Sequence, residues 1–138
     1  MYDKFGQFIN GKWQLAEKKE TYDVINPATE ELIGKASKAS SLDVQKALKS
    51  AQKGLEVWKN TAPWQRAYTL RKIADLMREN KDVLAKWLTL EVGKPLAEGV
   101  GEVGGAADIF EWNAEETKRI YGQTQQSRFP DTRVHVYY

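Results

Sequence analysis

Residues 99–104 form the pattern G-x-G-x-x-G, which is typical of loops that bind the pyrophosphate of a dinucleotide. Such a loop needs a strand before it and a helix after it, so that free backbone N–H groups at the helix start meet the phosphates. Residues 93–98 read instead as the end of one helix and the start of the next. The glycines therefore favour a helix that packs closely or leaves room for a ligand, and a small nucleotide-binding protein is an alternative.

Glu91 is a candidate for ion binding, because it follows Leu84, Trp87 and Leu88 at helical spacing on an apolar stripe. A carboxylate buried there needs a partner, since an unpaired buried charge is very costly. A salt bridge or backbone N–H groups would satisfy it. Coordination of a monovalent cation is the second interpretation, since hard oxygen donors suit a hard ion. A catalytic acid or base is the third, although no second titratable partner is in view.

Several chemistries are excluded by the residues that the chain lacks. It contains no cysteine and one histidine, His135, so a disulfide, a Cys-containing zinc site, a Cys nucleophile and a two-histidine site are all ruled out. His135 alternates with valines in a β-prone segment and is expected at the surface. Phe110 and Trp112 are aromatic residues of a kind more typical of a core than of a pocket. The residues alone thus assign no catalytic group and no cofactor-binding group.

Composition points to an ordinary globular chain. The 138 residues include 21 Lys and Arg against 19 Asp and Glu, a net charge of +2 that predicts no nucleic-acid or anionic-membrane partner. The chain contains no run of about eighteen apolar residues, so the sequence predicts no membrane helix. Residues 1–6 lack the apolar core of a signal peptide, so we expect a cytoplasmic protein.

The first third of the chain predicts two antiparallel hairpins. Residues 7–9 and 12–14 flank Asn10-Gly11, a pair that tolerates the positive φ angles of a type I′ turn. Residues 21–25 and 32–36 are β-prone and are separated by Asn-Pro-Ala-Thr, a segment that breaks a strand.

The middle of the chain predicts four helices. Ser40 with Asp43 predicts the N-cap of the first, Thr61 and Pro63 open the second, and Asn80 caps the third. Gly93 and Pro95 end the third helix, and the fourth runs from about residue 96 to residue 121.

The last residues predict an exposed strand. Residues 123–130 are polar and predict an irregular segment, and residues 132–138 alternate in a β-prone pattern up to the end of the sequence. An unpaired apolar strand invites association. We therefore expect this strand to pair with another chain or the sequence to belong to a longer one.

Five segments, taken in order and spacing, carry a family resemblance that covers essentially the whole chain. They are Phe-Ile-Asn-Gly-Lys-Trp at 8–13, Val-Ile-Asn-Pro-Ala-Thr at 24–29, the spacing of Trp58, Arg66 and Leu70, Leu-Glu-Val-Gly-Lys-Pro at 90–95, and Glu-Trp-Asn-Ala-Glu-Glu-Thr-Lys-Arg-Ile-Tyr-Gly at 111–122. Together they resemble the aldehyde dehydrogenase superfamily. The last segment is most similar to the semialdehyde and aromatic-aldehyde branch, which includes succinate-semialdehyde dehydrogenases.

The resemblance implies an α/β fold of which this chain is the N-terminal part: antiparallel hairpins, four helices flanking the dinucleotide-binding domain, and the first strand of an oligomerisation arm. It implies two regions, residues 1–122 in the NAD(P)-binding domain and residues 123–138 in the arm. The arm implies a homo-oligomer formed through the C-terminal strand.

The resemblance also implies an activity. Family members oxidise aldehydes to acids with NAD or NADP, using a Cys nucleophile, a Glu that activates water, and an oxyanion site made by an Asn side chain and a backbone N–H. All of these, and the nucleotide contacts, lie C-terminal to the region seen here in the family. We therefore expect this chain by itself to be inactive and to bind no cofactor. The alternative is a non-catalytic fragment or self-associating interaction module.

Two sets of residues match family sites. The cation site of the family, which would hold Na⁺ or K⁺, corresponds to the backbone oxygens of Val24 and Ile25 and to the side chain of Glu91. The aldehyde tunnel is lined in part by the long fourth helix. The matching residues there are Gly105, Ile109, Phe110 and Asn113.

Overall fold

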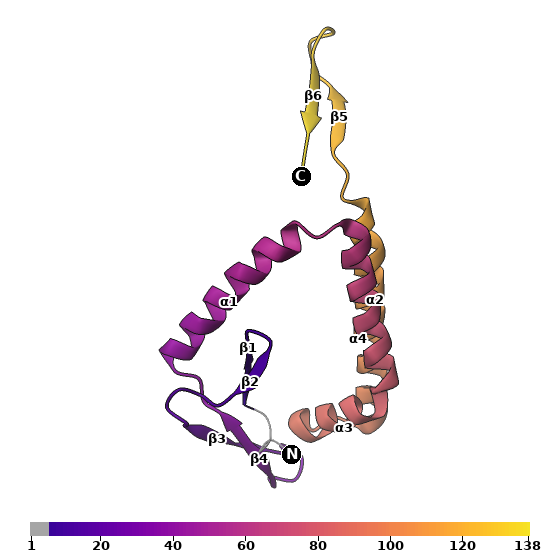
Figure 1. Ribbon diagram of the computed structural model, residues 1–138. Helices are drawn as coiled ribbons and strands as arrows, with labels where there is room; N and C mark the ends of the chain where they lie inside the picture. The colour runs from indigo at the N-terminus through magenta and orange to yellow at the C-terminus, as the bar shows by residue number, and fades with distance from the viewer. Residues whose placement is uncertain (1–5) are drawn as a thin grey trace.

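The computed structural model describes residues 6–138, so the expectation that no signal peptide begins the chain concerns residues that lie mostly outside the described part. Within residues 6–138 the chain forms three two-stranded sheets and four α-helices (Figure 1). The mixed helix and strand content and the order of hairpins before helices confirm the predicted fold class.

The first hairpin has the predicted turn. Strand β1 (Gln7–Ile9) pairs antiparallel with β2 (Lys12–Gln14) across Asn10 and Gly11, whose φ angles are 55° and 74°. Two positive φ angles match the right-handed twist of the strands. Phe8 faces Trp13 across the pair, with ring centroids 5.2 Å apart.

The second hairpin contains a bulge. Strand β3 (Thr21–Ile25) pairs with β4 (Leu32–Ser37), and the register shifts between Val24 and Ile25. After the bulge the buried Asn26 accepts a hydrogen bond on Oδ1 from the N–H of Ala28 at 2.9 Å. This side-chain turn reverses the chain into the loop before β4.

Helix α1 (Ser41–Lys59) starts at the predicted N-cap. The Ser40 hydroxyl accepts from the N–H of Asp43, and the Asp43 carboxylate accepts from the N–H of Ser40 at 2.8 Å, which completes a capping box. The same carboxylate accepts from the N–H of Glu17 at 3.1 Å and so ties α1 to the loop after β2. The hydrogen bonds from Ser40, followed by the one from Glu17, hold the pKa of Asp43 below its usual value.

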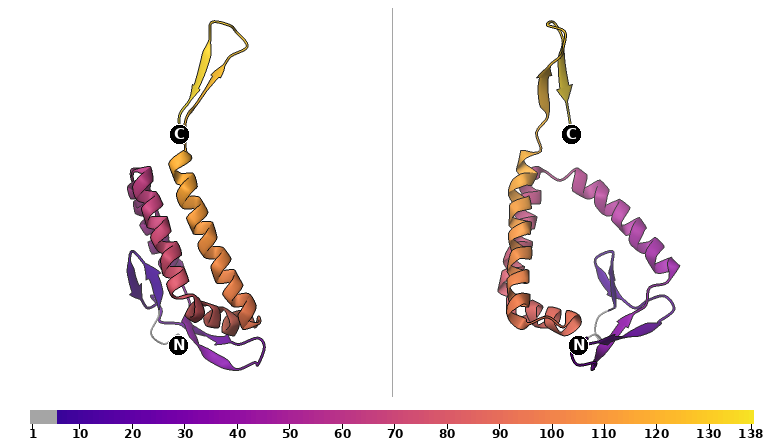
Figure 2. Two further views of the ribbon diagram at one scale, coloured as in Figure 1. Left: turned by 90° about the vertical axis from the view of Figure 1, so that its right-hand side faces the viewer. Right: turned by 180° about the vertical axis from the view of Figure 1, so that it is seen from behind.

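Helices α2 (Pro63–Glu79) and α4 (Leu96–Glu116) lie side by side (Figures 1 and 2). Apart from Gly99, which faces α3, the buried residues on both helices are mostly small, which lets the backbones approach closely: Ala67, Ala74, Val103, Ala107 and Ala114. Along the edge of this contact Arg78 of α2 bonds Asp108 at 2.8 Å and Glu111 at 2.6 Å, and these two bonds raise the pKa of its guanidinium.

Helix α3 (Lys81–Val92) connects the α2–α4 pair to the hairpins, and its start differs from the prediction. Asn80 stands at the N-cap position, but its side chain donates to the carbonyl of Leu76 at 2.8 Å and caps nothing in α3. The end of α3 is as predicted, because Gly93 adopts the left-handed conformation with φ 75°.

The fourth helix ends earlier than residue 121. Helix α4 gives way after Glu116 to one 3₁₀ turn, η2 (Thr117–Arg119). A tightening of the last turn is common where the final carbonyls lack partners.

The prediction for the tail was wrong in one respect. Residues 123–126 form strand β5 (Gln123–Gln126), which pairs with β6 (Arg133–Val136), so the segment is not irregular and β6 has a partner within the chain. All four residues of β5 are exposed, and a strand without a buried face leaves no alternation of apolar and polar residues to recognise. The hairpin projects beyond the helices (Figures 1 and 2).

The helices and hairpins form an open arrangement with little buried core. Helix α1 runs obliquely from the hairpins to the start of α2, so that only its C-terminal end comes near α4 (Figure 1). The accessible surface is 10560 Å², whereas a compact protein of this mass exposes about 7,300 Å². None of the large side chains in the described residues is completely buried.

Between residues 6 and 138 no helix combines the length and the apolar character that crossing a membrane requires.

Candidate functional site

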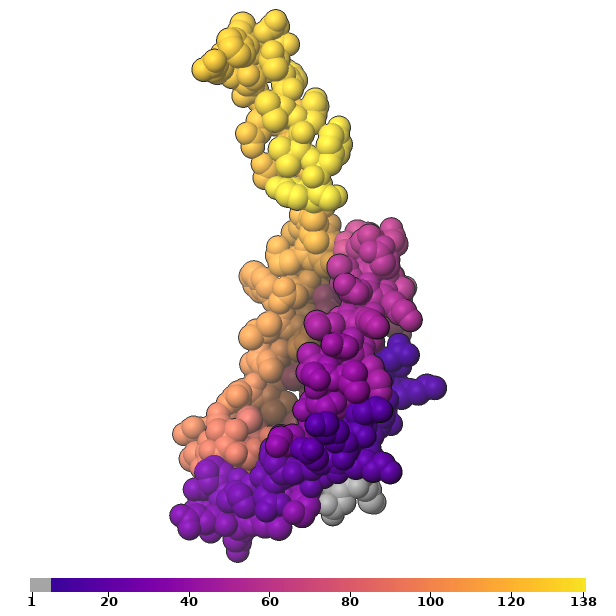
Figure 3. Space-filling model, turned by 90° about the vertical axis from the view of Figure 1, so that its left-hand side faces the viewer, coloured from indigo at the N-terminus to yellow at the C-terminus, as the bar shows by residue number. Residues whose placement is uncertain are grey.

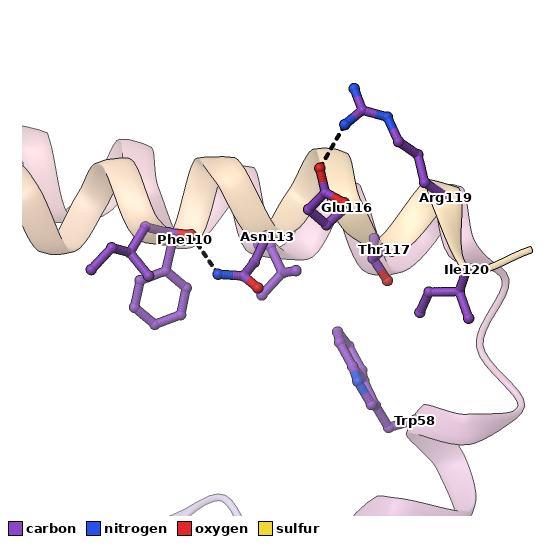
Figure 4. A pocket seen from close by; sticks show the side chains of 9 residues that line it. Trp58, Phe110, Asn113, Glu116, Thr117, Arg119 and Ile120 are labelled. Atoms are coloured by element: carbon purple, nitrogen blue, oxygen red, sulfur yellow. Dashed lines mark hydrogen bonds and ion pairs between the residues drawn. The ribbon is translucent and has the colours of Figure 1, made fainter.

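A pocket of about 630 Å³ lies where the C-terminal end of α4 meets the end of α1 and the middle of α2 (Figure 4). Trp58 comes from α1, Leu70 from α2, and the remaining lining residues from α4 and the turn that follows it. The α4 side of the pocket is formed by Ile109, Phe110, Asn113 and Glu116, and the following turn adds Thr117, Arg119 and Ile120.

The α4 face of the pocket follows from helical spacing. Phe110, Asn113 and Thr117 recur at intervals of three and four residues and so share one side of the helix. Figure 4 shows Phe110 and Asn113 on this side, with Trp58 opposite the end of the helix. The amide nitrogen of Asn113 donates to the carbonyl of Ile109 at 2.8 Å, which fixes the side-chain orientation.

Charged groups at the rim are paired with one another. Glu116 accepts from Arg119 at 2.6 Å, and both side chains are partly exposed. On the neighbouring side of the helix Glu115 bonds Lys118 at 2.6 Å, and the Lys118 ammonium lies 5.0 Å from the centre of the Trp64 ring. The pocket therefore offers an apolar wall, the Asn113 amide and the Thr117 hydroxyl, and its two charged residues, Glu116 and Arg119, are paired with each other.

Three of the four predicted tunnel residues lie together in this pocket: Ile109, Phe110 and Asn113. Gly105, one turn earlier on α4, is absent from the lining, and a Cβ added to it would meet no atom within 4 Å. Trp112 is 69% exposed, so the expectation that this aromatic residue belongs to a core was wrong for this chain.

Trp58, Leu70 and the residues after Asn113 also line the pocket, although the sequence did not predict their contributions. Helical spacing from Asn113 would have indicated Glu116 and Thr117. Trp58 and Leu70 reach the pocket only through the tertiary arrangement of α1 and α2.

The two segments predicted to form a cation site lie next to each other. A Cβ placed on Gly93, at the end of α3, would lie 3.0 Å from Cγ of Pro27 and 3.5 Å from Cβ of Ala28. The bulge at Val24 and Ile25 interrupts strand pairing two residues before Pro27. The end of α3, which carries Glu91, therefore contacts the loop that follows the two predicted carbonyl ligands.

The burial expected for Glu91 was wrong. Its side chain is exposed in this structure, as is that of Leu84 on the same stripe, whereas the buried residue of α3 is Ala85, which lies against Gly99 of α4. The described residues contain no cluster of three or more His, Cys, Asp and Glu side chains arranged to hold a metal ion. Any cation here would depend on backbone carbonyl oxygens together with this one carboxylate.

The glycine motif does not form a nucleotide site. Gly99 and Gly101 lie inside α4, after a helix end, with no strand before them. A Cβ on Gly99 would lie 3.0 Å from the carbonyl oxygen of Ala85, so this glycine permits the close contact of α3 and α4. Residues 99–104 thus provide no cradle for the pyrophosphate of NAD or NADP, and the alternative of a small nucleotide-binding protein that uses this motif loses its structural basis.

Comparison with known proteins gives the class of this chain. The model of the aldehyde dehydrogenase family matches residues 13–138. A glutarate-semialdehyde dehydrogenase of Pseudomonas putida is 44% identical over 129 residues, which cover 94% of this chain and 27% of the relative.

Solved structures of aldehyde dehydrogenases are also similar to this chain. A succinate-semialdehyde dehydrogenase from Burkholderia pseudomallei superposes with a TM-score of 0.87 at 39% identity, over 94% of this chain and 27% of that one. A point mutant of betaine aldehyde dehydrogenase from Staphylococcus aureus, solved in complex with NAD⁺, has a TM-score of 0.84 at 30% identity, over 93% of this chain and 26% of that one.

The chain belongs to the aldehyde dehydrogenase family. It corresponds to the N-terminal portion of the semialdehyde dehydrogenases that it matches, and spans about a quarter of their length, 27% in the Pseudomonas putida relative.

Proposed function

We propose that this chain forms the N-terminal portion of an NAD(P)-dependent dehydrogenase that oxidises an aldehyde or semialdehyde to the acid. The single observation that carries the proposal is the 44% identity to a glutarate-semialdehyde dehydrogenase across 94% of the chain. The pocket at the end of α4 supports a role as one wall of the aldehyde site, because its lining is mainly apolar and Asn113 is held in one orientation.

In this proposal the chain positions the substrate and performs no bond-making step. Phe110 and Ile109 exclude water from one side of the aldehyde, and Asn113 presents a polar group to it. The nicotinamide cofactor would accept the hydride in the intact enzyme, held by residues outside this chain. The 138 residues contain no Cys to form the covalent intermediate, so the chain by itself is proposed to be inactive.

A monovalent cation, Na⁺ or K⁺, is proposed near the carbonyl oxygens of Val24 and Ile25 and the carboxylate of Glu91. The contact of Gly93 with Pro27 and Ala28 supports this assignment, because it joins the two segments that would supply the oxygens. The bulge between Val24 and Ile25 supports it further, because a bulge leaves backbone groups outside the strand ladder.

The β5–β6 hairpin is proposed to be the start of an oligomerisation arm, with residues 123–138 as a separate region from residues 1–122. Its exposed strands project beyond the helices and offer free edges to a second copy. A cytoplasmic location is part of the same proposal.

Steady-state turnover tests the activity. Glutarate and succinate semialdehyde are offered with NAD or NADP to the purified chain and to a fusion of the chain with the remaining three quarters of the Pseudomonas putida relative. We expect reduced cofactor from the fusion only. Turnover that depends on the isolated chain would overturn the proposed inactivity, and a folded but inactive fusion would overturn the proposed role.

A self-associating, non-catalytic module is the second candidate, favoured by the 10560 Å² of accessible surface and the many exposed apolar side chains. Light scattering tests the self-association that this candidate requires, and a monodisperse monomer would contradict it.

A further inference from the structure

A groove lined by lysines lies between the first hairpin and α1, away from the pocket at the end of α4. Its volume is about 290 Å³, and four lysines line it: Lys12 from β2, and Lys46, Lys49 and Lys53 from α1. Figure 3 shows the hairpin in indigo against the purple and magenta helix.

Regular geometry brings the four side chains together. Residues 46, 49 and 53 are spaced by three and four, so their side chains lie along one stripe of α1. Lys12 and Gln14 alternate along β2 and therefore point to the same side of the hairpin. The stripe and the hairpin face enclose the groove, with Asn10 at the turn.

The positive charge of the groove is largely uncompensated. Lys46 bonds the carboxylate of Glu17 at 2.5 Å, and this bond raises the pKa of Lys46. Within residues 6–138, neither Lys12, Lys49 nor Lys53 forms an ion pair with a carboxylate, and all three are exposed. Three like charges thus converge on one small concave surface in a chain whose net charge is only +2.

We propose that this groove binds a small oligophosphate group, a function separate from aldehyde oxidation. Ammonium groups act as point charges for phosphate oxygens, and several of them around one concavity suit a compact multivalent anion. Asn10, Gln14 and Ser50 line the same groove and add neutral hydrogen-bonding groups. Nucleic acid needs an extended basic surface, whereas this groove is a single concavity of about 290 Å³.

Isothermal titration calorimetry of the purified protein with tripolyphosphate tests the proposal. The K49Q/K53Q double variant removes two groove charges. The matched control, K72Q/K86Q, removes two exposed lysines of α2 and α3 that also lack an ion pair in the described part of the chain. We expect about tenfold weaker binding for K49Q/K53Q and less than about twofold for the control, since charge-assisted hydrogen bonds to phosphate are the stronger ones.

Two further measurements separate the role of charge from folding and identify the ligand. The K49R/K53R variant retains the charge and is expected to bind within about threefold of the wild type, which separates loss of charge from loss of folding. ATP and tripolyphosphate are compared directly: equal affinity identifies the phosphate chain as the ligand, and tighter ATP binding identifies a nucleotide as its source.

The proposal is overturned if the wild-type protein does not bind tripolyphosphate, or if the two Gln double variants lose affinity equally. It is also overturned if a polyglutamate peptide binds the groove more tightly than tripolyphosphate, since the partner would then be an acidic protein segment.

Discussion

At the residue scale, single residues hold distant segments of this open chain together. Asp43 joins the start of α1 to the loop after β2, and Gly93 places the end of α3 against Pro27. Both positions were recognised from the sequence as local signals, a helix cap and a helix end. Their second roles as links between elements depend on the tertiary structure.

Asp43 is expected to make stability depend on acid pH. Its pKa is lowered in the folded chain, so its contribution is complete above the unfolded-state value of about 3.8 and is lost as pH falls through the folded-state value. The D43N variant should be less stable than the wild type near neutral pH, and the difference should shrink below about pH 3.8. Urea unfolding across this range measures it. D75N, at an exposed aspartate of α2, is the control and should show little difference at any pH.

Glu91 is expected to make stability respond to monovalent cations. Replacing choline with K⁺ or Na⁺ at constant ionic strength should raise the thermal midpoint of the wild type and leave E91Q unchanged. E79Q, at the exposed end of α2, should respond like the wild type. Equal responses of wild type and E91Q would remove Glu91 from the proposed site.

At the element scale, small residues decide how closely the helices pack. Gly99 faces the carbonyl of Ala85 in α3, whereas a Cβ on Gly101 would meet no atom within 4 Å. Two glycines two residues apart in one helix therefore have different reasons to be present.

G99A is expected to lower the free energy of unfolding by about 1–2 kcal/mol, because the added methyl group must displace a helix backbone. G101A should raise it by up to about 1 kcal/mol, since alanine is the better helix former and meets open space. Chemical denaturation of both variants measures the difference. If G99A proves as stable as G101A, the close contact of α3 and α4 is not present in solution.

What the sequence could predict at this scale was local. The type I′ turn, the capping box and the glycine that ends α3 depend on neighbouring residues, and all three were correct. Strand β5 was missed because its stabilising partner, β6, lies ten residues away and neither face of β5 is buried. The side chain of Asn80 was assigned to the wrong helix, since a cap and a bond to the preceding turn compete for the same group.

In the candidate site, too, the sequence predicts what neighbouring residues determine and misses what the packing of distant elements determines. Ile109, Phe110 and Asn113 line one pocket because one helix carries them, and their role in an aldehyde tunnel stays a prediction. Trp58 and Leu70 join them from two other helices, and Gly105 does not, because only the packed arrangement of α1, α2 and α4 determines the pocket. The exposure of Glu91 was missed because one helix face was assumed to be wholly covered.

At the scale of the whole molecule, the chain exposes apolar surface that a compact protein would bury. Phe8, Trp64 and Ile109 are each more than half exposed, and most of the length of α1 lies apart from α4 (Figure 1). The isolated chain should therefore bind the dye ANS and self-associate as its concentration rises. Sedimentation velocity over a concentration series measures this, and a concentration-independent monomer would contradict it.

The fusion of this chain to the remaining three quarters of the Pseudomonas putida glutarate-semialdehyde dehydrogenase tests the central claim most directly. Its turnover of glutarate semialdehyde is compared with that of the isolated chain and of a fusion carrying N113W. The account predicts activity in the first fusion, none in the isolated chain, and a KM raised about tenfold or more by N113W, whose larger side chain would fill the pocket. A folded fusion without turnover, or an unchanged KM in N113W, would contradict it.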